Sequence, residues 1–112
     1  MKIRADDLSN YDILECFQKI SQYLSGVTKQ EFENNPMLQD AVVRNIEIIG
    51  EASKCLSTEF RDQKPNIEWQ EIMRMRDKII HHYFKIDLGL VWETASRDIP
   101  EIARELRTAS PS

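Results

Sequence analysis

The chain is poor in glycine and proline, with 3 and 4 residues in a length of 112. This is about half the share of an average soluble protein, so a fold built on tight turns and β-hairpins is disfavoured and a helical domain is favoured. The sequence also lacks a run of about 18 apolar residues that could span a membrane. No apolar stretch resembling a signal peptide lies between Met1 and Asn10, and we therefore expect a cytoplasmic protein.

Cysteine is scarce as well. Cys16 and Cys55 fall inside helical patterns without the spacing of metal ligands, which predicts reduced thiols in the core rather than a disulfide.

The length suits one domain covering residues 1–112. The formal net charge of -4 argues against a protein that coats nucleic acid with a basic surface.

Apolar residues recur at helical spacing along four segments. These segments run from about Asp6 to Ser25, Pro36 to Phe60, Ile67 to His82 and Leu88 to Leu106. The apolar stripe of the second segment is predicted to consist of Ala41, Ile48, Ile49, Ala52, Cys55 and Leu56. Short connections without internal repeats favour an all-α fold, an antiparallel up-and-down bundle of four to five helices.

Local signals mark the helix ends. Gly26 is expected to end the first helix, and Thr28 with Glu31 forms a capping-box pattern that opens a short helical turn. Pro100 removes a backbone donor and is predicted to kink or split the last helix. Two further residues are predicted N-caps, Asn35 before Pro36 and Asp87 before the last helix.

Three polar residues interrupt the apolar faces. At about 100° per residue, Arg76 lies roughly 40° and Tyr83 roughly 20° from Ile72 on the third helix. A guanidinium on an apolar face must be paired or line a cleft, because it cannot lose its charge. Asn45 lies near the centre of the second helix's apolar arc, where it either fixes the packing register or supports a site.

His81 and His82 follow Arg76 on the same segment. In a continuous helix His81 would project about 140° away from Arg76, so the two side chains could not meet on one face. Either the helix distorts or ends at the histidines, or a second copy of the chain completes the site across a two-fold axis. We expect a homodimer with a cleft at the two-fold interface.

The charges around this motif are unevenly distributed. Four cations, Arg74, Arg76, Lys78 and Lys85, accompany one anion, Asp77, which gives a local charge of +3. Subtracting this +3 from the total of -4 leaves -7 on the rest of the chain. Two such segments facing each other would form a basic groove able to bind phosphates, although cations near a helix C-terminus also complement the helix dipole.

An arginine, a histidine and a tyrosine beside a basic groove suit cleavage of RNA without a metal. Histidine titrates near ~6.5 and can remove the proton of a 2'-hydroxyl or protonate a leaving 5'-oxygen. A fixed guanidinium can stabilise the charge that develops on the phosphorus oxygens, and a tyrosine can orient the phosphate or base. A metal site is a weaker alternative, because adjacent helical histidines point about 100° apart.

Two segments resemble a known family. Arg76, followed by His81 and Tyr83, resembles the R-x4-H-x-Y motif of the HEPN superfamily in its HepT branch. The stretch from Asp40 to Ala52 resembles a characteristic segment of the same branch. The similarity extends from about residue 6 to 106.

The resemblance implies an all-α homodimer and a toxin that acts as a metal-independent endoribonuclease without a cofactor. It assigns catalytic roles to Arg76, His81 and Tyr83, with Asp77 beside them. His82, like Asn45, is a candidate supporting residue, and Arg74, Lys78 and Lys85 are candidate RNA-binding residues. Members of the branch pair with a minimal nucleotidyltransferase antitoxin, which in some cases attaches AMP to the motif tyrosine, here Tyr83.

Two other interpretations stay open. The chain could be a nucleotide-responsive binding module that serves as substrate for a nucleotidyltransferase partner and has little catalysis of its own. It could also be a structural helical dimer whose basic segment only caps a helix.

Overall fold

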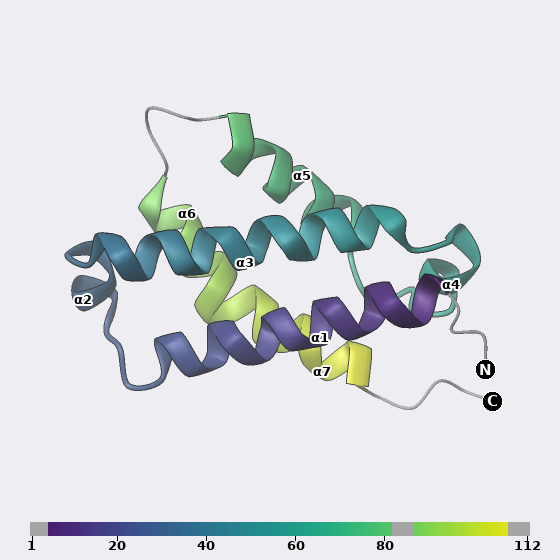
Figure 1. Cartoon of the computed structure of the whole chain (residues 1–112), viewed down its shortest axis with the longest axis horizontal. Helices are drawn as coiled ribbons and strands as arrows, with labels where there is room; N and C mark the ends of the chain where they lie inside the picture. Colours follow the sequence, from purple (N-terminus) through teal and green to yellow (C-terminus); the bar gives the residue numbers. More distant parts are fainter. Residues whose placement is uncertain (1–4, 82–86, 108–112) are drawn as a thin grey trace.

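The computed structural model describes residues 5–81 and 87–107, and within these ranges all regular structure is helical (Figure 1). The elements are α1 (Ala5–Leu24), α2 (Lys29–Glu33), α3 (Pro36–Cys55), α4 (Thr58–Asp62), α5 (Trp69–His81), α6 (Leu88–Glu93), a π-helical segment η1 (Thr94–Asp98) and α7 (Ile99–Arg107). The predicted all-α class is confirmed. In the described ranges no helix is both long enough and apolar enough to cross a bilayer.

The long helices α1 and α3 lie side by side and run in opposite directions (Figure 1). The α5 helix packs along another side of α3, and the α6–η1–α7 arm lies across the α1–α3 pair. The core between them is built from apolar side chains of every long element, among them Ile13, Phe17, Ile20, Val42, Ile46, Ile49, Ile79, Val91, Ala95 and Ile99. Because α1, α2, α5 and α6 all pack against α3, it is the scaffold on which α5 is positioned.

The predicted helix ends are largely confirmed. Gly26 follows α1 with φ of +72°, a left-handed conformation that favours glycine. The Thr28 hydroxyl accepts a hydrogen bond from the backbone N–H of Glu31, and the Glu31 carboxylate bonds back in a capping box. Asn35 and Asp87 accept N-cap hydrogen bonds at the starts of α3 and α6.

The prediction of one helix from Pro36 to Phe60 is wrong, because α3 ends at Cys55 and α4 is separate. Leu56 is buried in an extended conformation, and Ser57 caps α4. The Asp6 carboxylate of α1 accepts hydrogen bonds from the backbone N–H and the hydroxyl of Ser57. This contact with a segment distant in sequence stabilises the break, and the apolar spacing contains no sign of it.

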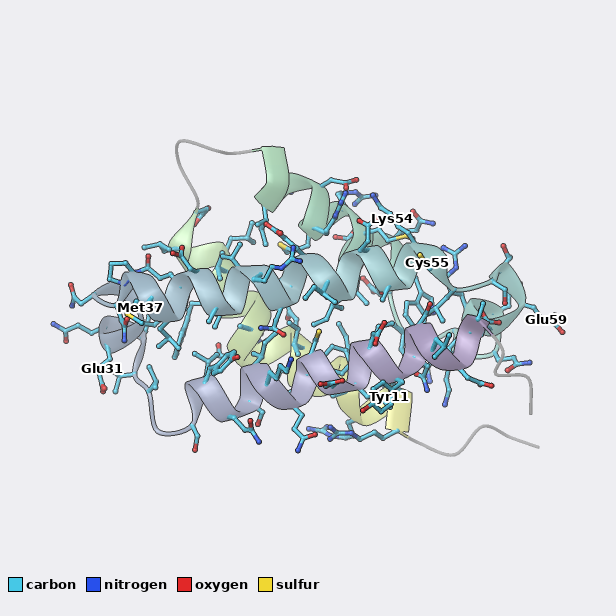
Figure 2. The ribbon with its side chains drawn as sticks, viewed as in Figure 1. Tyr11, Glu31, Met37, Lys54, Cys55 and Glu59 are labelled. Carbon is cyan, nitrogen blue, oxygen red and sulfur yellow. The ribbon has the colours of Figure 1, made fainter. Side chains whose placement is uncertain are left out.

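The predicted apolar stripe of α3 is only partly correct. Ile49, Ala52 and Leu56 are buried, whereas Cys55 is exposed, so its prediction as a core thiol is wrong (Figure 2). Cys16 is buried as predicted, and burial raises the pKa of its thiol. Ala41 and Ile48 are half-buried. The prediction missed several buried residues on other faces of α3, namely Val42, Val43 and Ile46.

The last predicted helix is interrupted before Pro100, as expected. The interruption is the π-helical turn η1, and α7 begins at Ile99. Because the Pro100 nitrogen carries no hydrogen, the carbonyl of Ser96 cannot receive the usual helical bond from it. The hydroxyls of Thr94 and Ser96 donate to carbonyls one turn earlier, at Leu90 and Trp92. The wider turn accommodates the proline while the apolar face continues into α7.

Candidate functional site

Arg76 lies where α5 crosses α3, directly over Gly50. A Cβ atom added to Gly50 would lie 2.3 Å from Cβ and 2.5 Å from Cγ of Arg76, which is closer than real carbon atoms approach. The arginine stem therefore rests on the α3 backbone, and its side chain is only 22% exposed. This placement agrees with the prediction that Arg76 interrupts an apolar face and must be paired.

The guanidinium of Arg76 forms ion pairs with one carboxylate from each helix. Nη2 lies 2.5 Å from Oε2 of Glu51 on α3, and Nη1 lies 3.1 Å from Oδ1 of Asp77 on α5. Lys54 of α3, which Figure 2 labels, places Nζ 2.8 Å from the same Asp77 oxygen. Glu51, Arg76, Asp77 and Lys54 thus form a network of alternating charge.

These contacts shift the titration of Asp77. Hydrogen bonds from Lys54 and then from Arg76 hold the pKa of Asp77 below its ordinary value. A carboxylate with a depressed folded-state pKa stabilises the fold at pH values above its unfolded pKa, and this contribution is lost as the pH falls through the folded value. Asp77 is therefore ionised at neutral pH, and its pairing with both cations persists there.

The structure describes some of the other predicted site residues and not others. His81 is the last described residue of α5, so the helix is continuous from Arg76 to it, although nothing is described of its side chain. Asn45 is buried on α3, and its side-chain amide donates to the carbonyl of Ala41 one turn earlier. Arg74 and Lys78 are exposed on α5. Three predicted residues lie outside the described ranges, namely His82, Tyr83 and Lys85.

Carboxylates moderate the predicted basic character of α5. Arg74 forms an ion pair with Glu71 one turn earlier in its own helix. Glu51 approaches Arg76 from a different helix, which counting charges along the segment could not anticipate. The described part of the segment, residues 74–81, has a formal charge of +2, and neighbouring carboxylates partly balance it.

A hollow in the described structure lies away from Arg76, between α5 and the η1–α7 segment. Its volume is about 480 Å³, and Met75 and Thr94 line it from the two sides. Its charged lining residues are Glu68, Glu71, Asp98, Glu101, Arg104 and Glu105. Burial raises the pKa of Asp98, with the nearby Glu93 and Glu101 carboxylates acting in the same direction. This predominantly acidic lining would repel RNA phosphates, so the Arg76 site is the better candidate.

Sequence reasoning missed Gly50, Glu51 and Lys54 as parts of the site. A glycine inside a long helix costs about 1 kcal/mol relative to alanine, so Gly50 was a detectable sign of close packing. Nothing in the sequence pattern identified Arg76 as the residue that packs against Gly50. Within the described residues, no group of three or more His, Cys, Asp and Glu side chains is placed to hold a metal ion.

An all-helical domain that carries Arg76 packed against a central helix, with His81 later on the same α5 helix, has the features of the HEPN class. The family described as "Ribonuclease HepT-like" matches residues 13–109. The chain belongs to this HepT-like family, as its motif segments predict.

Similar proteins occur in archaea. The chain is 41% identical over 96 residues to a Methanocaldococcus jannaschii protein named "Putative RNase", with 86% of this chain and 88% of that protein covered. It is 41% identical over 91 residues to "Probable ribonuclease HepT" of Thermococcus cleftensis, covering 81% of this chain and 83% of that protein.

A longer M. jannaschii protein, "Gamma-glutamylcyclotransferase and putative RNase", is 47% identical over 94 residues. The match covers 84% of this chain but only 42% of that protein. No solved structure gives a significant match.

Proposed function

We propose that the chain is an endoribonuclease that cleaves RNA with Arg76, His81 and Tyr83 and without a metal ion. The observation that carries this proposal is the fixed guanidinium of Arg76 at the α3–α5 crossing, on the same continuous helix as His81. The ribonuclease names of similar proteins from two archaea support the same activity.

The proposed reaction is an internal transfer of the phosphodiester. His81 removes the proton of the ribose 2'-hydroxyl, and the 2'-oxygen forms a bond to phosphorus while the bond to the 5'-oxygen breaks. A protonated histidine returns a proton to the leaving 5'-oxygen. Arg76 donates hydrogen bonds to the phosphoryl oxygens as their negative charge increases. Tyr83 orients the phosphate or base, and the products are a 2',3'-cyclic phosphate and a 5'-hydroxyl.

The proposed active unit is a homodimer. On a regular helix, position 81 lies about 140° around the axis from position 76, so the two residues of one chain face different directions. A two-fold axis beside α5 would bring Arg76 of one copy near His81 of the other. In that cleft Arg74, Lys78 and Lys85 contact RNA phosphates, and Asp77, His82 and Asn45 support the catalytic residues.

The proposed biological role is that of a cytoplasmic toxin controlled by a minimal nucleotidyltransferase antitoxin. Attachment of AMP to the Tyr83 hydroxyl would add bulk and negative charge to the cleft and block RNA entry. The resemblance of the motif segments supports this role. A binding module modified at Tyr83 but unable to cleave RNA is the alternative.

Subunit mixing tests the proposed nuclease. We expect the wild-type chain to cleave RNA and His81→Ala to be inactive, because the variant lacks the acid-base group. A refolded mixture of inactive His81→Ala and Arg76→Ala chains should regain part of the activity, since each mixed dimer has one intact site. Full activity of His81→Ala would contradict the proposed chemistry. Two inactive variants that stay inactive after mixing would contradict the shared site.

A further inference from the structure

Glu51 contributes a carboxylate to the candidate site from outside the R-x4-H-x-Y motif. Its Oε2 atom lies 2.5 Å from Nη2 of Arg76. Asp77 approaches the other terminal nitrogen, Nη1, at 3.1 Å. The two ends of the guanidinium are therefore anchored by carboxylates from different helices.

The stem of Arg76 is restrained as well. Gly50 lets the stem lie against the α3 backbone, where any side chain at that position would overlap it. With the stem packed and each terminal nitrogen paired with a carboxylate, the guanidinium is held in one orientation. Each terminal nitrogen carries two N–H groups, so one bond to each leaves further donors for a phosphate.

Glu51 and Asp77 do not hold Arg76 in the same way. The Asp77 oxygen that accepts from Arg76 also accepts from Lys54, at 2.8 Å. Glu51 forms a shorter ion pair with Arg76, and its own side chain is 59% exposed. Because two carboxylates balance two cations, the network has little net charge with which to attract RNA. We expect the network to contribute to cleavage by fixing the direction of the guanidinium.

We propose that Glu51 is a positioning residue that orients the Arg76 guanidinium toward the scissile phosphate. This inference rests on the proposed RNA cleavage. A carboxylate so close to the guanidinium could instead compete with the phosphate for it. The two roles have opposite kinetic signatures, since loss of a positioning residue lowers kcat whereas loss of a competitor lowers KM.

Steady-state cleavage of a short RNA by Glu51 variants separates these roles. We expect Glu51→Ala to lower kcat by about 10- to 100-fold, because small displacements of a positioned group are costly, with KM changed by less than about 3-fold. Glu51→Gln should lose less, since its amide oxygen still accepts a hydrogen bond. A lower KM with unchanged kcat, or unchanged kinetics, would overturn the proposal.

Glu47→Ala is the matched control. Glu47 lies one turn earlier on α3 and pairs with Arg44 at 3.6 Å rather than with Arg76. We expect its kcat and KM to stay close to those of the wild type. An equal loss of kcat in Glu47→Ala and Glu51→Ala would indicate a general effect of charge on α3 and overturn the proposal.

A spectroscopic measurement tests the contact without relying on activity. In ¹⁵N-edited NMR spectra, we expect the Arg76 guanidinium protons to be resolved by slow rotation in the wild type and averaged in Glu51→Ala. The assignment comes from the signals missing in Arg76→Ala. Unchanged Arg76 signals in Glu51→Ala would overturn the positioning role. If the wild-type chain does not cleave RNA but Glu51→Ala still shows this NMR change, the proposed function is contradicted and the restraint of Arg76 by Glu51 is not.

Discussion

Arg76→Ala is expected to reduce RNA cleavage by about 100- to 1000-fold, the loss typical of removing one donor that stabilises a developing oxyanion. The variant should stay folded. The carboxylates that lose their partner, Glu51 and Asp77, are 59% and 45% exposed, and Asp77 keeps Lys54. No buried charge is left without compensation, so the large penalty for breaking a buried ion pair does not apply.

Circular dichroism and cleavage rates measured on the same preparation test this prediction. Arg97→Ala is a suitable control, because Arg97 is 77% exposed and pairs with Glu93 one turn earlier in the chain. We expect the control to retain wild-type activity. A collapse of the helical signal in Arg76→Ala would make Arg76 a structural residue, and unimpaired cleavage would remove it from the proposed mechanism.

Gly50→Ala is expected to destabilise the fold and impair cleavage together. The new methyl carbon would lie 2.3 Å from Cβ of Arg76, an atom that no rotation of the arginine side chain can move away. The α3 and α5 helices must therefore separate, and such overpacking costs about 1–3 kcal/mol. Alanine recovers about 1 kcal/mol through its higher helix propensity, so the expected net destabilisation is up to about 2 kcal/mol.

Urea unfolding and cleavage assays measure the two parts of this prediction. Activity should fall by more than the unfolded fraction explains, because separating the helices also moves the guanidinium away from Glu51. Gly89→Ala is a useful comparison, since among the described residues its added carbon would approach only the Asp87 side chain, at 3.3 Å. A Gly50→Ala chain that is clearly more stable than the wild type and fully active would contradict the close crossing.

Local patterns in the sequence predicted much of the fold. Caps at Thr28, Asn35 and Asp87 depend on residues a few positions apart, and all three form as expected. The break at Leu56 depends on Asp6, about fifty positions away, and periodicity carries no information about such a contact. The burial of α3 on several sides likewise depends on which helices surround it.

The candidate site was predictable to a similar degree. Arg76 was identified because a cation on an apolar helical face requires a partner, and its pairing follows that expectation. The identity of the partner was not predictable, since Glu51 reaches Arg76 only after α3 and α5 cross. The roles of His81, His82, Tyr83 and Lys85 stay predictions, because the described structure contains none of their side chains.

The chemical nature of the RNA ends tests the proposed mechanism most directly. RNA is incubated with the purified chain in excess chelator, and the ends of the fragments are identified by mass spectrometry. Attack by the 2'-oxygen predicts 2',3'-cyclic phosphate and 5'-hydroxyl ends at a rate unaffected by the chelator. Fragments with 5'-phosphate ends, or cleavage abolished by the chelator, would contradict a metal-independent reaction at Arg76 and His81.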